Sequence, residues 1–253
     1  MVEQSAVNRL VAGSSPASRA NFIMRKLHAC GFYRSGSTFA YNLLKRINEG
    51  FDLGYKMNKK EHNVWFEDVT KDDLSVYTYR DIRNVTASFI RFHIKNKKCR
   101  KVKTGHYIMS LDGGKEEELT INNFILYSLQ YDAFMTVKIM EGFNVLKIRY
   151  ENEIFDDCKI AITKVLNYLK AKYEPKDINT LESLLSVEKV KKEISTATDN
   201  GMINSDTFYC SNHIYDGISD YKSFFTEGEI DNLPPFTKNS LKKYCLNNGY
   251  EFE

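Results

Sequence analysis

A short run of small and polar residues, Cys30-Gly31-Phe32-Tyr33-Arg34-Ser35-Gly36-Ser37-Thr38-Phe39, separates two segments with regular apolar spacing. Residues 26–32 are mainly apolar and end close to Gly31, which predicts a buried strand. Residues 37–47 repeat apolar side chains at the spacing of a helix face. A turn between a strand and a helix binds anions, because the first N–H groups of the helix are unpaired and its dipole is positive there. The sequence therefore predicts a phosphate-binding turn.

The position of the cation in this turn distinguishes between families of phosphate-binding proteins. Gly31 and Gly36 have the spacing of a P-loop, but Ser37 stands where kinases and NTPases have lysine. The cation is Arg34, two residues before Gly36. A P-loop kinase is therefore the less favoured interpretation, and a turn that binds nothing is a further alternative.

The turn resembles an element of the sulfotransferases that use the donor PAPS (3′-phosphoadenosine 5′-phosphosulfate). That element has proline, a basic residue, serine, glycine and two hydroxyl residues, and residues 33–38 match it except that Tyr33 replaces proline. The resemblance implies that Arg34 lies on the 5′-phosphosulfate as a catalytic and donor-binding residue. It implies that Ser35, Gly36, Ser37 and Thr38 cradle this group. Phe39 takes the place of an aromatic residue that stacks on adenine, although a core position is an equal alternative.

A second segment, residues 79–89, resembles the 3′-phosphate element of the same family. Arg80 ends an apolar run, and Ser88 follows eight residues later. The resemblance implies that both contact the 3′-phosphate, for which arginine offers a planar pair of donors. The alternative is that Arg80 and Asp81 pair and cap a helix.

Two further segments resemble parts of the family that surround the nucleotide. Residues 145–151 end in Tyr150-Glu151, and the resemblance implies that Tyr150 lies near the adenine. Residues 216–226 resemble an element that closes over the donor, with Tyr221 in place of tryptophan and Lys222 retained. The basic residues that usually precede this element are missing, and His213 stands nearby. We expect His213 and Lys222 to be donor-binding residues.

The resemblance implies an enzyme that transfers a sulfuryl group from PAPS to a hydroxyl or amine of a small-molecule acceptor. The reaction would be an in-line displacement that releases PAP. The alternative is a protein of the same fold that binds PAP or PAPS without turnover, because one catalytic residue of the family is altered.

That residue is the histidine of a lysine-x-histidine element. In many family members this histidine removes the proton from the acceptor substrate. Lys56-Met57-Asn58 lies at the corresponding distance before Arg80, with asparagine in place of histidine. Lys56 is expected to assist the leaving group. A neutral imidazole is the usual general base near pH 7, so His62 is the first candidate for the base and Glu61 the second. Either residue can equally be a solvated helix residue.

Apolar segments with strand and helix character alternate along the rest of the chain. Strands are expected at 51–57, 75–79 and 143–150, and helices at 61–69, around 85–92, and at 119–140, 154–173, 181–194 and 238–247. Residues 95–118 are polar and basic and are expected to form a long loop. This order predicts an α/β fold with a central, mainly parallel β-sheet flanked by helices on both faces, like that of P-loop-containing sulfotransferases. Ligands of such sheets bind at the carboxyl ends of the strands.

Composition limits the remaining possibilities. The 253 residues carry a formal net charge of +3, so no nucleic-acid partner is expected. The five cysteines form no C-x-x-C pair, which argues against a metal site and favours reduced thiols in a cytoplasmic protein. No apolar run is long enough for a membrane span. We expect residues 1–23 to be a disordered or spurious extension, residues 24–253 to form a single sulfotransferase domain, and the protein to be a monomer or homodimer.

Overall fold

The computed structural model describes residues 25–58, 69–110, 115–186, 188–190, 192, 220–226 and 228–252. Several expectations fall outside these residues. They concern the extension 1–23, the helix expected at 61–69 except for its last residue, the candidate bases Glu61 and His62, and His213.

The centre of the fold is a parallel β-sheet of four strands in the order β2-β1-β3-β7. The strands are β1 (Lys26–Cys30), β2 (Lys56–Met57), β3 (Leu74–Tyr79) and β7 (Asn144–Arg149). β1 and β3 lie in the middle, so the turn after β1 and the residues after β3 meet at the same edge of the sheet. The predicted second strand, 51–57, is reduced to the two residues of β2.

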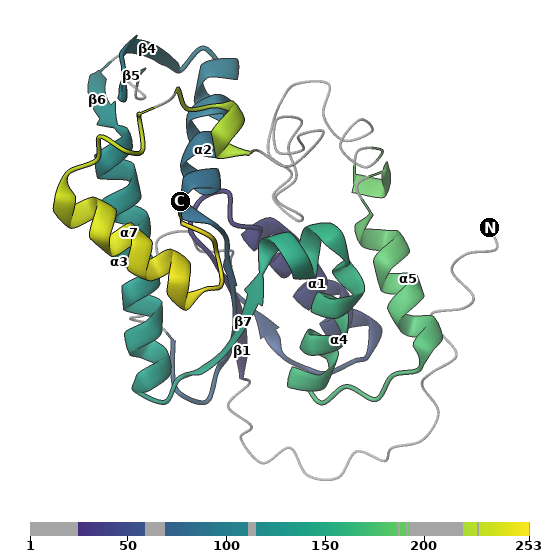
Figure 1. Cartoon of the computed structure of the whole chain (residues 1–253). Helices are drawn as coiled ribbons and strands as arrows, with labels where there is room; N and C mark the ends of the chain where they lie inside the picture. Colours follow the sequence, from purple (N-terminus) through teal and green to yellow (C-terminus); the bar gives the residue numbers. More distant parts are fainter. Residues whose placement is uncertain are drawn as a thin grey trace, which may run out of the picture.

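Helices cover both faces of this sheet (Figure 1). One face carries α1 (Ser37–Gly50), α4 (Cys158–Tyr168) and α5 (Pro175–Leu185). The other carries α2 (Ile82–Lys95), α3 (Ile121–Met140) and α7 (Pro235–Asn247). The predicted α/β architecture is therefore confirmed.

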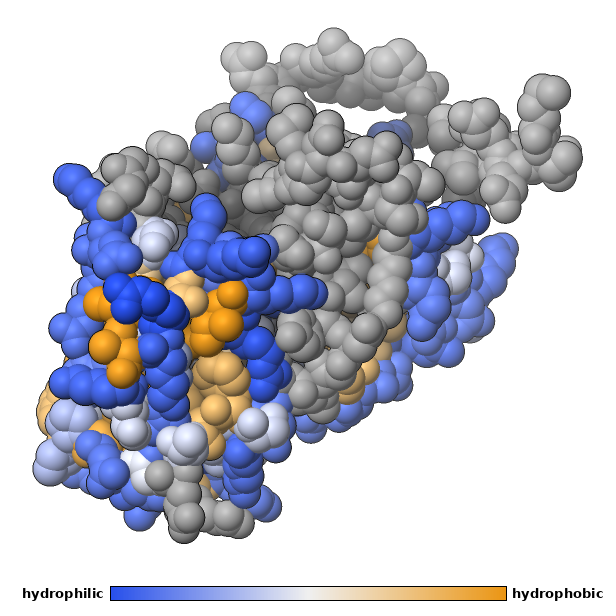
Figure 2. Space-filling view, turned by 90° about the horizontal axis from the view of Figure 1, so that it is seen from above, coloured by the Kyte–Doolittle hydropathy of each residue, from blue (hydrophilic) through white to orange (hydrophobic). Residues whose placement is uncertain are grey.

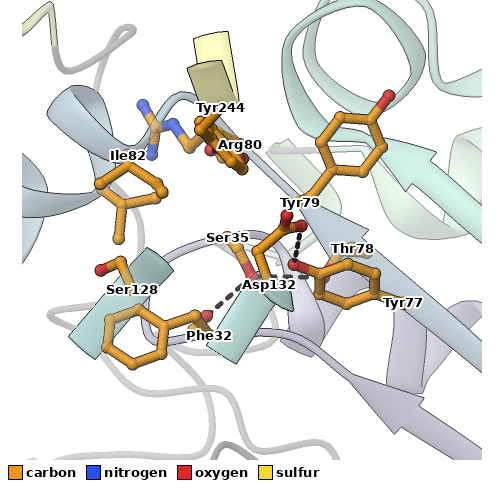
Figure 3. A pocket seen from close by; sticks show the side chains of 11 residues that line it. Phe32, Ser35, Tyr77, Thr78, Tyr79, Arg80, Ile82, Ser128, Asp132 and Tyr244 are labelled. Carbon is orange, nitrogen blue, oxygen red and sulfur yellow. Dashed lines mark hydrogen bonds between the residues drawn. The ribbon is translucent and has the colours of Figure 1, made fainter. Parts of the chain in front are cut away.

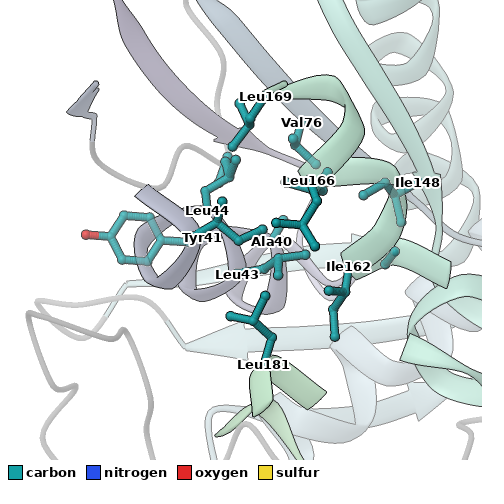
Figure 4. Close-up of a cluster of buried hydrophobic side chains, with 14 of the residues drawn as sticks. Ala40, Tyr41, Leu43, Leu44, Val76, Ile148, Ile162, Leu166, Leu169 and Leu181 are labelled. Carbon is teal, nitrogen blue, oxygen red and sulfur yellow. The ribbon is translucent and has the colours of Figure 1, made fainter. Parts of the chain in front are cut away.

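The larger core cluster lies between the sheet and the first group of helices (Figure 4). Leu27 and Ala29 of β1 and Val76 of β3 are fully buried there, because alternate residues of a strand point to the same face. Fully buried residues of α1 and α4 face them, namely Ala40, Leu43, Leu44, Ile47, Ala161, Ile162, Val165 and Leu166. This packing fixes the start of α1 relative to the end of β1.

The prediction of a long loop at 95–118 is wrong. This region holds a three-stranded antiparallel sheet, β4 (Cys99–Lys103), β5 (His106–Ser110) and β6 (Glu116–Thr120). Only Cys99 and Tyr107 of these strands are buried, so the apolar alternation is weak. The signal that would have found the hairpin is the Thr104-Gly105 turn, where Gly105 has φ 72°.

Some helix boundaries also differ from the expectation. The helix expected at 154–173 is a π-helical turn, η3 (Glu151–Asp156), followed by α4. The helix expected from 181 begins earlier as α5, because Pro175 occupies its first turn and Glu174 and Asp177 form a capping box. A short 3-10 helix, η4 (Tyr221–Ser223), precedes α7.

Among the described residues seen from above, most side chains are hydrophilic, with small groups of apolar side chains between them (Figure 2). Within the part of the chain that the structure describes, no helix is both long and apolar enough to cross a membrane.

Candidate functional site

The turn after β1 is tight and well anchored. Ser35 donates its backbone N–H (3.1 Å) and its hydroxyl (2.7 Å) to the carbonyl oxygen of Phe32. The N–H of Gly31 donates to the hydroxyl of Tyr131 on α3 at 3.1 Å. Arg34 and Gly36 both have positive φ, 65° and 99°. The turn therefore holds a backbone shape that few residues adopt, directly before α1.

Gly36 is required by space as well as by conformation. A Cβ atom at this position would lie 2.7 Å from Cδ2 of Tyr150. Gly36 is also the N-cap of α1 and has no side chain to cap the helix, and the first turn of α1 contains no acidic residue. No side chain of α1 therefore offsets the positive end of the helix dipole, which can attract a bound anion.

The two segments that the sequence singled out meet at this turn. Arg34 Nε donates to the hydroxyl of Ser88 at 3.2 Å, and Arg80 Nη1 donates to the carbonyl oxygen of Arg34 at 3.2 Å. The guanidinium of Arg34 also lies 5.0 Å from the ring centre of Phe92. Two cations and a hydroxyl from separate strand ends thus converge on one short stretch of backbone.

Arg80 is the most constrained cation of the site. It is only 5% exposed, and its guanidinium lies 4.5 Å from the ring centre of Tyr150. Its Nε is 3.8 Å from Oε1 of Glu151 and has no hydrogen-bond partner among the described residues. A buried donor without a partner is costly, so a bound anion would stabilise this arrangement.

The other predicted turn residues lie around these cations. Ser35 and Ser37 are buried, and Thr38 is half-buried in the first turn of α1. Phe39 is half-buried and packs against the larger core cluster, as its alternative interpretation expected. The structure therefore brings together Arg34, Ser35, Gly36, Ser37, Thr38, Arg80, Ser88 and Tyr150.

Lys56 lies elsewhere. It pairs with Lys26 at the amino end of β1. Lys26 is four residues before Cys30, so Lys56 lies about 13 Å from the end of β1, measured along the strand. Asn58 Nδ2 lies 3.1 Å from Nδ1 of the buried His28, also below the edge of the sheet. Residues 59–68 lie outside the described ranges. The lysine-x-histidine spacing occurs there too, at Lys60-Glu61-His62.

Lys222 lies beside the start of α2. It is exposed on η4 and lines an open pocket of about 340 Å³ together with Arg83, Arg149 and Glu251. None of the turn residues lines that pocket. Its neighbour Tyr221, which replaces the family tryptophan, donates its backbone N–H to Asn84 at 2.8 Å.

Beside Arg80 lies a small cavity of about 10 Å³ (Figure 3). Ser35, Thr78 and Asp132 are among the residues that line it. Tyr77 donates its hydroxyl to Asp132 at 2.9 Å, and burial raises the pKa of Asp132. A cavity of this size holds at most one water molecule.

Among the described residues, no group of three or more histidine, cysteine or acidic residues is arranged to hold a metal ion.

One titratable residue beside the site has an unusual environment. His93 lies one helical turn after Phe89, with ring centres 4.4 Å apart, and its Nδ1 is buried without a hydrogen-bond partner among the described residues. Burial, together with the charges of Lys98 and Arg34, lowers the pKa of His93 below its ordinary 6.5. The side chain is therefore neutral at pH 7.

We predict that an NMR titration places the pKa of His93 below 6.5. Because the folded pKa lies below the unfolded one, the contribution of His93 to stability is complete above pH 6.5 and is lost as the pH falls. His93→Gln should therefore show a smaller loss of stability in acid, measured by urea unfolding between about pH 5 and 7. A measured pKa at or above 6.5 would contradict this description of the site.

Comparisons with known proteins give structural matches. No family model matches the chain, and no curated protein matches it in sequence. The mouse sulfotransferase SULT7A1, solved in complex with PAP, superimposes with a TM-score of 0.58 over 89% of this chain and 85% of its own, at 13% identity. Retinol dehydratase, solved with androsterone and PAP, superimposes with a TM-score of 0.50 over 91% of this chain and 83% of its own, at 14% identity. The same enzyme solved with retinol and PAP gives the same TM-score and identity. This chain has the fold of the PAPS-dependent sulfotransferases.

Proposed function

We propose that this protein is a sulfotransferase that transfers a sulfuryl group from PAPS to a hydroxyl or amine of a small molecule and releases PAP. The observation that carries the proposal is the contact between Arg80 and the carbonyl oxygen of Arg34. It places two arginines at one glycine-bounded turn, with a buried donor of Arg80 left for an anion. Similar folds solved with PAP support the same ligand.

The residues of the site would suit a nucleotide that carries phosphates on both the 3′ and the 5′ positions of its ribose. Arg34, the backbone of residues 35–38 and the amino end of α1 would hold the 5′-phosphosulfate. Arg80 and Ser88 would hold the 3′-phosphate, and Tyr150, whose ring lies over the guanidinium of Arg80, would border the adenine. The roles of Phe39, Lys222 and His213 remain proposals that the fold neither places in nor removes from the donor site.

PAPS supplies an activated sulfuryl group whose leaving group is PAP. The chain's own contribution is to hold the reactants in line and to offset negative charge. Arg34 is suited to this role, because its guanidinium stays charged and Ser88 fixes its direction. The positive end of α1 acts at the same place without any change in protonation.

A base must also remove the proton of the acceptor. We propose His62 for this role, with Lys60 rather than Lys56 as the accompanying cation and Glu61 as the second candidate for the base. The proposal is supported by the register of β2, which puts Lys56 at the amino end of the sheet. It is also supported by the spacing of Lys60-Glu61-His62 in the sequence.

A protein that binds PAP without turnover is the second candidate function. Asn58, which occupies the histidine position in the alignment with residues 56–58, lies against His28, and an amide cannot act as a general base. If His62 does not serve as the base, the site retains its anion-binding groups but lacks one catalytic group.

We predict that Arg80→Ala and Arg34→Ala each weaken PAP binding by at least about tenfold, because each removes a charge-assisted contact with a phosphate. Isothermal titration calorimetry measures the effect, and thermal unfolding verifies that the variants are folded. The matched control is Arg100→Ala, since Arg100 is exposed and pairs only on the surface with Glu116. Parent-like affinity in both site variants would show that the donor site is assigned wrongly.

Turnover separates the two candidate functions. With labelled PAPS and a panel of phenols, alcohols and amines, we expect the parent to form sulfated product. We expect His62→Ala to lower kcat at least about a hundredfold, because general-base catalysis typically contributes that much. PAP affinity should stay unchanged. Normal turnover of His62→Ala would exclude His62 as the base, and a parent that binds PAP but forms no product on any acceptor would favour the second candidate function.

A further inference from the structure

The last residues of the chain lie against the donor-binding segment rather than apart from it. The C-terminal segment, residues 244–252, comprises the end of α7 and the chain that follows it. In Figure 1 the chain end lies beside α2, which begins directly after Arg80. Three separate contacts link this C-terminal segment to the residues around Arg80.

The first contact is a hydrogen bond to the backbone of Arg80 itself. The hydroxyl of Tyr244 donates to the carbonyl oxygen of Arg80 at 2.8 Å. Tyr244 is buried, and burial raises its pKa well above the ordinary value, so the hydroxyl keeps its proton. The position of the Arg80 backbone is therefore tied to α7.

The second contact reaches Arg80 through Glu151. Glu151 Oε1 accepts the backbone N–H of Asp81 at 3.1 Å and lies 3.8 Å from Nε of Arg80. Its other oxygen, Oε2, accepts the hydroxyl of Tyr250 at 2.9 Å. Burial raises the pKa of Tyr250, so this tyrosine also remains a donor. The carboxylate that faces Arg80 is thus held in place by the C-terminal segment.

The third contact is made by Arg83, which is 4% exposed. Its guanidinium donates to both carboxylate oxygens of Asp81, at 2.6 to 3.2 Å. It also donates to the hydroxyl of Tyr221 at 2.8 Å and to the carbonyl oxygen of Glu251 at 2.7 Å. Arg83 therefore joins the start of α2, the η4 segment and the C-terminal segment at one point.

These contacts bear on the donor site because they add to the restraints that the ring of Tyr150 and the carbonyl oxygen of Arg34 place on Arg80. A long side chain loses much rotamer freedom when it is fixed, and this loss opposes ligand binding unless the protein has already imposed it. Glu151 faces the side chain of Arg80 and Tyr244 holds its backbone carbonyl, and Tyr250 and Arg83 in turn hold Glu151 and Asp81. Among the described residues, the contact of Arg80 with the turn itself is a hydrogen bond to the carbonyl oxygen of Arg34.

We propose that the C-terminal segment is a functional part of the donor site, in which Tyr250 and Arg83 are positioning residues that fix Arg80 through Glu151 and Asp81. The proposal rests on the proposed function, because it concerns the affinity of the same site for a nucleotide phosphate. It predicts an effect on donor binding and none on the chemical step or on the acceptor.

The test is Tyr250→Phe, which removes the hydroxyl bound to Glu151 and keeps the ring that stacks on Tyr244 and lies under Arg149. The matched control is Tyr168→Phe. The hydroxyl of Tyr168 is hydrogen-bonded too, but to the backbone of Asn144 and Ser75. These residues lie at the amino ends of β7 and β3, away from Arg80. Each variant is characterised by its Kd for PAP from calorimetry, by KM for PAPS, kcat and acceptor KM, and by thermal unfolding.

We expect Tyr250→Phe to raise the Kd for PAP and the KM for PAPS by about three- to tenfold, the effect of one lost hydrogen bond, with kcat and acceptor KM unchanged. Tyr168→Phe should leave all four values unchanged. Arg83→Lys, which keeps the charge but cannot reach Asp81, Tyr221 and Glu251 together, should reproduce the effect of Tyr250→Phe.

Parent-like PAP affinity in folded Tyr250→Phe and Arg83→Lys, with Arg80→Ala still impaired, would overturn this inference and leave the proposed function intact. A fall in kcat with unchanged KM for PAPS would also overturn it. A parent that does not bind PAP would contradict the proposed function itself, and the inference with it.

Discussion

The candidate site depends on one buried guanidinium. Arg80 directly follows β3 at the centre of the sheet, is 5% exposed, and donates to the carbonyl oxygen of Arg34 in the neighbouring turn. A buried cation is tolerated only where oxygen atoms surround it. Here the carbonyl oxygen of Arg34 and the carboxylate of Glu151 meet part of that need, and Nε stays without a hydrogen-bond partner among the described residues. The arrangement is therefore suited to an anion that completes the set.

The rest of the fold keeps this guanidinium beside the turn. β1 and β3 are adjacent and parallel, with Cys30 level with Tyr77, so both strands deliver their ends to one edge. The larger core cluster fixes α1 on the sheet, and Gly36 lets Tyr150 approach the turn closely. On the opposite face, α7 and the residues after it reach back to Arg80, Arg83 and Glu151. The two layers of helices thus hold the same site from both sides.

Much of this could be predicted from the sequence, because the informative signals are local. The turn is defined within residues 31–36, and Arg80 and Ser88 are only eight residues apart, the first just before α2 and the second within it. The alternation of strands and helices was enough for the architecture. The contacts that support Arg80 could not be predicted, because Tyr250 to Glu151, Arg83 to Tyr221 and Tyr244 to Arg80 span 99, 138 and 164 residues. The position of Lys56 depended on strand register, and the β4–β6 sheet was hidden by charged side chains on exposed strands. Neither property leaves a clear pattern in a single sequence.

The central claim is that the site recognises a nucleotide by two phosphates, one at the turn and one at Arg80. The most direct measurement compares the affinity of the protein for PAP with its affinity for adenosine 5′-phosphate, which lacks the 3′-phosphate, and for ATP. A charge-assisted pair between Arg80 and a 3′-phosphate should make PAP bind at least about tenfold more tightly than adenosine 5′-phosphate. Equal affinity for the two, or tighter binding of ATP than of PAP, would contradict the account.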